Sequence, residues 1–161
     1  MTILSVDKDT DALTLTFVAE FAADVERVWQ VWEDPRQLER WWGPPTWPAT
    51  FTTHELSVGS RSSYYMTGPD GTKAGGWWLI TAVDAPTRLE FDDGFADDDG
   101  TPDDSIEPVH AIVSLESVDG KTRMTTLSQF VSLEQLEKLV EMGMQGGMTL
   151  AMGQIDAILA A

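Results

Sequence analysis

The spacing of apolar side chains changes several times along the chain and predicts a different element at each change. Apolar residues alternate with polar or small ones over residues 13–21, as in a strand with one buried face. Over residues 25–32 they recur at helical spacing, and Asp24 is placed to cap that helix. A second short helix is predicted over residues 35–42, with Asp34 as its cap. The first strand is therefore followed by two short helices.

Strand and turn signals dominate the middle of the chain. Asp119-Gly120 is typical of a tight β-hairpin, and other glycines and prolines separate the remaining strands. Since most of these connections are short, we expect a curved antiparallel meander. Its strands are predicted at residues 49–58, 61–67, 77–83, 89–92, 109–118 and 123–131.

The C-terminal part of the chain has the pattern of one long helix. Ser132 and Gln135 form a capping box, and apolar residues then recur at helical spacing as far as residue 159. Each glycine inside a helix costs about 1 kcal/mol relative to alanine, so several glycines together need a structural reason. We favour close packing of the helix on the sheet, with a kink over a pocket as the alternative. The glycines concerned are Gly143, Gly146, Gly147 and Gly153.

These elements predict one α+β domain over residues 1–161. We expect a curved antiparallel sheet of about six to seven strands around a long C-terminal helix, with two short helices after the first strand. A chain of 161 residues can bury a core without disulfide or metal. It has no cysteine, which excludes a cysteine nucleophile, thiolate ligands and disulfides and is compatible with a cytoplasmic location. No stretch approaches the length of a membrane span.

Charge narrows the range of partners. The chain carries 27 acidic and 10 basic residues, a net charge of −17 at pH 7. Such a field repels phosphate backbones and anionic lipids. We therefore expect neither nucleic acid nor a membrane as a partner.

Tryptophan is concentrated near the N-terminus, where five of the seven lie within nineteen residues. A cluster this dense forms either ordinary core or the wall of an apolar pocket. Tyr65 or His54 would orient the polar end of a ligand, and Thr53, Tyr64, Arg61 and Gln129 are further polar candidates whose direction depends on strand parity. The predicted lining consists of Trp29, Trp41, Trp42, Trp47, Tyr65, Trp77, Phe95, Met144, Met148 and Met152.

Motifs for catalysis and for cofactor binding are missing from the sequence. His54-Glu55 would begin a zinc protease motif, but Val58 stands where the second histidine is needed. There is no nucleophile elbow, phosphate loop or dinucleotide fingerprint. The acidic run over residues 92–107 has the wrong register for a calcium loop and predicts a solvated loop, in which Gly94-Phe95 could fold over the cavity as a lid. We identify no catalytic residue and expect no metal and no cofactor.

The order of elements and several short motifs resemble the helix-grip superfamily of START domains, polyketide cyclases and the birch-pollen allergen. Within it, the chain is similar to the single-domain bacterial form of the family named for the activator of heat-shock protein 90 ATPase. The resemblance spans about residues 13–159 and implies the helix-grip fold. It rests on Val28-Trp29, Asp34-Pro35, Leu38, Trp41-Trp42-Gly43-Pro44, Val58-Gly59, Met66, Gly68-Pro69-Asp70-Gly71, Ile80, Pro86, Arg88-Leu89 and Gly147.

The superfamily includes binders, transporters and cyclases, so the resemblance implies no single function. Leu79 replaces an acidic residue common in such domains, and Met148 replaces a tryptophan. Both changes favour binding over catalysis. The chaperone-binding N-terminal domain of the eukaryotic activator has no counterpart in the sequence, so chaperone activation is not carried over.

Three functions are compatible with these observations. The first is the binding of a hydrophobic or aromatic small molecule in an apolar cavity. The second is a cyclase- or hydrolase-type enzyme, which needs an inward titratable residue with a partner. The third is a protein-interaction or stress-response module with an exposed apolar patch around Trp41-Trp42 and Pro44-Pro45. A homodimer is compatible with each of them.

Overall fold

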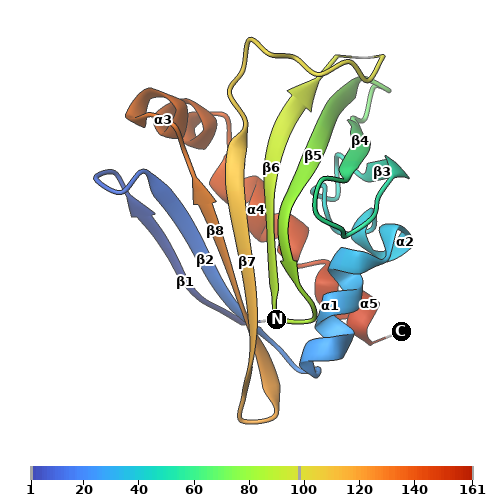
Figure 1. The fold of residues 1–161 in the computed structure, drawn as a ribbon, viewed down its shortest axis with the longest axis vertical. Coiled ribbons are helices and arrows are strands. Elements are labelled where there is room, and N and C mark those ends of the chain that lie inside the picture. Colours follow the sequence, from blue (N-terminus) through green and yellow to red (C-terminus); the bar gives the residue numbers. More distant parts are fainter. Residues whose placement is uncertain (1, 98, 161) are drawn as a thin grey trace.

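A curved, eight-stranded antiparallel sheet forms most of the molecule in the computed structural model, which describes residues 2–97 and 99–160 (Figure 1). The strand order is β1-β2-β8-β7-β6-β5-β4-β3, so the meander expected for the middle of the chain is confirmed. The strands are β1 Thr2–Asp9, β2 Thr14–Phe21, β3 Ala49–Thr53, β4 Arg61–Thr67, β5 Lys73–Asp84, β6 Arg88–Ala96, β7 Val109–Val118 and β8 Lys121–Gln129.

The sheet has more strands than the sequence pattern predicted, because β1 lacks an apolar alternation. Among the described side chains of this edge strand, only Ile3 and Val6 pack against the core, and a register shift interrupts its pairing with β2 between Ile3 and Ser5. Most of its other described residues are exposed. Main-chain hydrogen bonds, rather than a buried face, therefore define this strand, and they leave little signal in the sequence.

Three strands also differ in length from the prediction, and one of them is β5, which begins at Lys73 rather than at residue 77. β3 ends at Thr53, so the predicted strand over residues 49–58 is too long and His54 follows the strand. β6 continues to Ala96, beyond the predicted end at Asp92, and so includes Asp93 from the run that predicts a solvated loop. The strand can include Asp92 and Asp93 because each carboxyl group has a hydrogen-bond partner. These partners are His110 on one face of the sheet and Tyr64 on the other.

The two short helices start at their predicted caps. Helix α1 (Val25–Glu33) is capped by Asp24, whose carboxylate accepts a hydrogen bond from the Arg27 backbone N–H at 2.8 Å. Asp34 caps α2 (Pro35–Leu38) in the same way, through the Arg36 N–H at 2.9 Å. Helix α2 is shorter than predicted and ends at Leu38, so Trp41 and Trp42 follow it in a turn.

The predicted single C-terminal helix is broken into α3 (Leu133–Glu141), α4 (Met144–Met152) and α5 (Ile155–Leu159). Gly143 separates the first two and has a φ of +94°, which glycine adopts without strain. A Cβ added at Gly143, Gly146 or Gly147 would meet nothing within 4 Å. The expectation that these glycines permit close packing on the sheet is therefore wrong, and the kink is the correct alternative.

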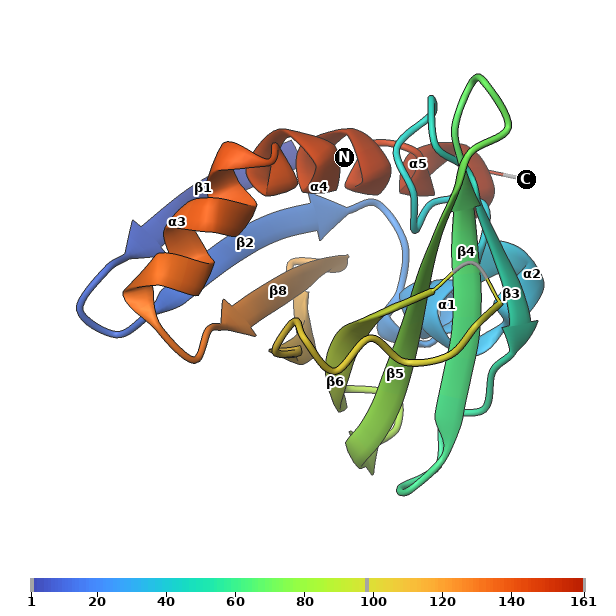
Figure 2. The ribbon, with the colours of Figure 1, turned by 90° about the horizontal axis from the view of Figure 1, so that it is seen from above.

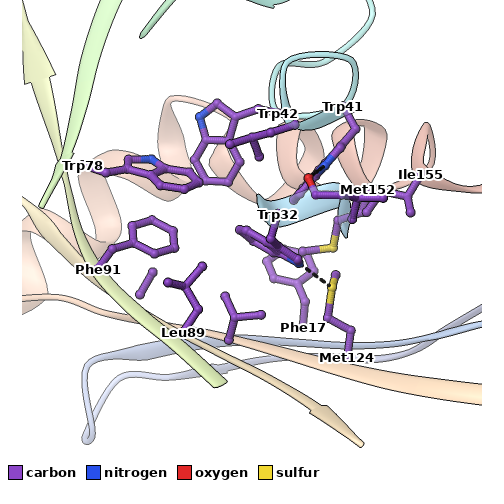
Figure 3. Packing of buried hydrophobic residues seen from close by; sticks show 14 of the residues in the cluster. Phe17, Trp32, Trp41, Trp42, Trp78, Leu89, Phe91, Met124, Met152 and Ile155 are labelled. Carbon is purple, nitrogen blue, oxygen red and sulfur yellow. Dashed lines mark hydrogen bonds between the residues drawn. The ribbon is translucent and has the colours of Figure 1, made fainter. Parts of the chain in front are cut away.

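The core lies between the sheet, α1 and the C-terminal helices, and aromatic rings fill much of it (Figure 3). Trp78 stacks on Phe91 with ring centroids 4.0 Å apart. Trp32 is fully buried and its indole N–H points to the Met124 sulfur at 3.4 Å. None of the helices in the described part of the chain is both long and apolar enough to cross a membrane.

Candidate functional site

A cavity of about 340 Å³ lies between the sheet and the C-terminal helices. Strands β4, β6, β7 and β8 contribute one wall, and α3, α4 and their junction contribute the other. Figure 2 shows α3 and α4 lying across the concave side of the curved sheet. Most of the lining is apolar, including Met66, Phe91, Val109, Ala111, Leu139 and Met142.

The break in the C-terminal helix is part of the cavity wall. Gly143 and Gly147 both line it, and neither carries a side chain that would occupy the space. Met144 and Met148 lie beside them on α4. Methionine side chains are flexible and polarisable, so this wall can adapt to ligands of different shape.

A carboxyl group and a phenol meet at one place in the cavity wall. The Tyr64 hydroxyl on β4 donates a hydrogen bond of 2.7 Å to Asp93 Oδ1 on β6. β5 lies between these strands, and its Gly76 pairs with Tyr64. A Cβ at Gly76 would overlap the Tyr64 ring, so the glycine leaves the space that the ring needs to reach Asp93.

Burial changes the proton affinity of both groups. It raises the pKa of the Asp93 carboxyl to about 7, although the hydrogen bond from Tyr64 acts in the opposite direction. Burial also raises the pKa of Tyr64 well above its ordinary value, and the nearby Asp93 charge adds to this effect. Near neutral pH, Tyr64 is therefore a protonated donor while Asp93 can gain or lose its proton.

Two further polar atoms of the wall are unpaired among the described residues. Trp42 Nε1 and Thr126 Oγ1 are buried and have no hydrogen-bond partner. The Trp42 indole lowers the pKa of Tyr64, against the larger effect of burial. Buried polar groups are normally paired, so these two atoms are exceptions in the cavity wall.

Four of the predicted lining residues lie in the cavity wall, namely Trp42, Phe95, Met144 and Met148. Phe95 is there as part of strand β6, and not as part of a mobile loop that closes over the cavity. The lid predicted for Gly94-Phe95 is therefore wrong.

The other tryptophans of the cluster belong to the core or to a turn. Trp29 and Trp41 are buried outside the cavity, and the Trp41 indole N–H donates to the Val31 carbonyl at 2.9 Å. Met152 is fully buried in the same core. The Trp47 ring packs against Gly68, where a Cβ would leave it no space. For these four residues, burial in the core or packing in the turn explains the apolar pattern, and none lines the cavity.

Tyr65 and Trp77 point to the other face of the sheet. Successive residues of a strand face opposite sides, so Tyr64 faces the cavity and Tyr65 faces away from it. Tyr65 lies under the Lys73 ammonium at 4.5 Å from the ring centroid. Trp77 lies under the Arg61 guanidinium at 4.9 Å and donates its indole N–H to the Phe95 carbonyl at 3.1 Å. Tyr65, which we expected to orient a ligand, therefore does not line this cavity, whereas Tyr64 does.

His54 has a structural position outside the cavity. One ring nitrogen lies 2.7 Å from the Ser62 hydroxyl and the other 2.8 Å from the Trp32 carbonyl oxygen. Burial lowers the pKa of His54, so the neutral ring is favoured. The side chain connects the end of β3 to β4 and to α1.

The outer face of the sheet carries a second titratable cluster. The His110 ring lies 2.8 Å from the Asp92 carboxylate and 3.2 Å from that of Glu90. Partial burial lowers the pKa of His110, but the hydrogen bonds and charges of Asp92 and Glu90 outweigh it and raise the pKa. Within the described residues, no group of three or more histidines and acidic residues could hold a metal ion.

Trp41 and Trp42 do not form the exposed apolar patch expected for an interaction module. Trp41 is fully buried and Trp42 is 8% exposed. Both rings pack against Trp32, in edge-to-face contacts with centroids 4.7 and 6.1 Å away. The tryptophans therefore do not contribute to the expected patch, whereas Pro44 is partly exposed and Pro45 is exposed.

Solved structures of several bacterial proteins have the same fold. A solution structure of a protein from Arthrobacter aurescens is 62% identical, with a TM-score of 0.94, covering 99% of this chain and 92% of that one. A crystal structure of a protein from Mycobacterium smegmatis is 47% identical, with a TM-score of 0.90, covering 98% and 96%. A protein from Silicibacter pomeroyi shares the fold at 21% identity and a TM-score of 0.71, covering 91% and 97%.

The family of the chain follows from a match over most of its length. No curated protein matched the chain. A family model described as Activator of Hsp90 ATPase homolog 1-like protein matches residues 22–160, which include both short helices, β3 to β8 and the C-terminal helices. The chain therefore belongs to the Activator of Hsp90 ATPase homolog 1-like family, within the helix-grip superfamily.

Proposed function

We propose that the protein binds a hydrophobic or aromatic small molecule in the cavity between the sheet and α3–α4. The observation that supports this proposal is the lining, which is apolar except at a few points, chiefly Asp93 and Tyr64. Small-molecule sites commonly combine a volume above about 300 Å³ with apolar walls and a few polar groups that orient the ligand. The volume of about 340 Å³ lies in that range.

Binding can be tested with the neutral, fluorescent aromatic N-phenyl-1-naphthylamine. We expect one molecule to bind per chain, with increased emission, and native mass spectrometry of the freshly purified protein would show whether a natural ligand is retained. No binding of the probe and no retained molecule would contradict the proposal.

Gly147 offers a variant that separates binding from stability. Gly147→Leu places a side chain at the cavity wall where a Cβ meets nothing within 4 Å, so it should weaken probe binding about tenfold or more without destabilising the fold. Gly146→Leu is the matched control, since Gly146 lies on the same helix, is exposed and does not line the cavity. Equal affinities of the two variants would place the probe elsewhere.

A second candidate function, acid–base catalysis on the bound molecule, is favoured by the Asp93–Tyr64 pair. A carboxyl with a pKa of about 7 can both accept and donate a proton at neutral pH, and Tyr64 can orient it. The test is to incubate the protein with any molecule recovered from it and analyse the products. Catalysis predicts that Asp93→Asn still binds this molecule but no longer converts it, and an unchanged molecule after incubation with the wild type would argue against an enzyme.

A further inference from the structure

We propose that the cavity selects organic cations, meaning hydrophobic amines or quaternary ammonium compounds whose charged group lies beside the Asp93 carboxylate. This inference rests on the proposed binding function and adds the chemical class of the ligand. It is carried by the charges of the lining, the aromatic rings that line the same cavity as Asp93, and the Tyr64 hydrogen bond.

The first argument is the lack of a counter-charge. Among the described residues that line the cavity, Asp93 is the only acidic side chain, and none is basic. A carboxylate without a cationic partner is unfavourable in an apolar environment. A ligand cation would supply the missing charge, whereas a ligand carboxylate would meet repulsion.

The second argument is the arrangement of aromatic rings. Trp42 lies 6.1 Å from Tyr64 and 6.2 Å from Phe91, measured between ring centroids. These rings and Phe95 line the same cavity as Asp93. The faces of aromatic rings attract cations, and most strongly where water is excluded. Aromatic rings that share an apolar cavity with a single carboxylate therefore favour a large, weakly hydrated cation over a small, strongly hydrated one.

The third argument concerns the groups that hold Asp93. The Tyr64 hydroxyl already occupies one carboxylate oxygen, Oδ1, at 2.7 Å. Tyr64 is the only other titratable residue of the described lining, and its raised pKa keeps it protonated at neutral pH. Among the groups of the described lining, Asp93 is therefore the one that titrates between pH 6 and 8, and His110, whose pKa is also raised, lies on the outer face of the sheet.

The test compares benzyltrimethylammonium with its uncharged isostere neopentylbenzene, each measured by displacement of N-phenyl-1-naphthylamine. At pH 8 we expect the wild type to bind the cation at least tenfold more tightly than the isostere. Because a quaternary ammonium has no proton to lose, its affinity should fall about tenfold between pH 8 and pH 6 as Asp93 becomes protonated. The affinity of the isostere should stay constant.

Asp93→Asn and Asp92→Asn provide matched variants. Both remove one negative charge from adjacent positions of β6, but Asp92 faces the outer side, where it contacts His110. Asp93→Asn should lose the preference for the cation and its pH dependence, while Asp92→Asn should keep both. Thermal unfolding checks that each variant is folded.

The outcomes distinguish the two proposals. If the naphthylamine probe does not bind and native mass spectrometry finds no retained molecule, the proposed function fails and the inference fails with it. If the probe binds but the isostere displaces it as well as the cation does, the binding function stands and the inference is overturned. A preference for the cation that persists in Asp93→Asn would also overturn it, because the carboxylate would then not be the recognition group.

Discussion

Asp92 and Asp93 are chemically identical neighbours with different surroundings. Asp92 faces the outer side of the sheet and pairs with His110 at 2.8 Å, whereas Asp93 faces the cavity and accepts from Tyr64 at 2.7 Å. Strand parity alone separates them. Burial at the cavity wall raises the pKa of Asp93 to about 7.

The proton affinity of Asp93 leads to a prediction about stability. Its pKa is higher in the folded state than in the unfolded chain, so ionisation costs more when the protein is folded. The contribution of Asp93 to the free energy of unfolding should be largest below about pH 4 and should decrease as the pH rises to 7, by at most about 4 kcal/mol. Asp93→Asn should lack this decrease.

Urea unfolding of the wild type, Asp93→Asn and Asp92→Asn at pH 5 and pH 8 would measure this change in the free energy of unfolding. We expect Asp93→Asn to gain stability relative to the wild type between the two pH values. If the free energy of unfolding changed equally with pH in the wild type and in Asp93→Asn, Asp93 would not lie in a desolvated site.

At the level of elements, the break between α3 and α4 shapes the cavity. Gly143 lies at the break with a left-handed backbone, and Gly147 lies one turn further along α4. Both residues leave space in the wall where other residues would project a side chain. The C-terminal helix is therefore interrupted at a point where it lines the cavity.

The glycines of this region should respond to alanine with opposite signs. Gly143→Ala forces a side chain into a φ of +94° and should lower the free energy of unfolding by about 1 kcal/mol. Gly146→Ala lies inside α4, in open space, and should raise it by up to about 1 kcal/mol. Chemical denaturation of both variants measures these changes. Destabilisation by both would mean that α4 needs glycine for a reason other than backbone conformation.

At the scale of the whole molecule, the net charge of −17 surrounds a cavity whose described lining has one acidic and no basic side chain. The long-range field and the local carboxylate therefore act on a ligand cation in the same direction. The field acts on the rate of association, whereas the carboxylate acts on the bound state.

Salt should separate these two contributions. Raising NaCl from 20 to 500 mM should slow the association of benzyltrimethylammonium several-fold, because salt screens the field of the surface charges. Its dissociation rate should change little, and the neutral isostere should show no salt dependence of association. Stopped-flow displacement of the naphthylamine probe measures all three rates. Equal salt effects on the cation and the isostere would exclude electrostatic steering.

Local patterns in the sequence were sufficient for the main elements. The caps at Asp24 and Asp34, the hairpin at Asp119-Gly120 and the strand over residues 109–118 lie where the sequence predicted them. These signals depend on a few neighbouring residues, so they can be recognised without tertiary contacts. Edge strand β1 was missed because its main-chain pairing leaves no comparable pattern.

The candidate site depended on contacts between distant segments. The sequence by itself determined the acidic charge, the aromatic and methionine-rich composition, the order of elements and the resemblance to the family. Only the tertiary structure decided that Tyr64 rather than Tyr65 faces inward, that Gly76 leaves space for its ring, and that Asp93 meets it across β5. The physical reason is that burial and pairing arise from strand register and sheet curvature, which bring together residues that are far apart in the chain.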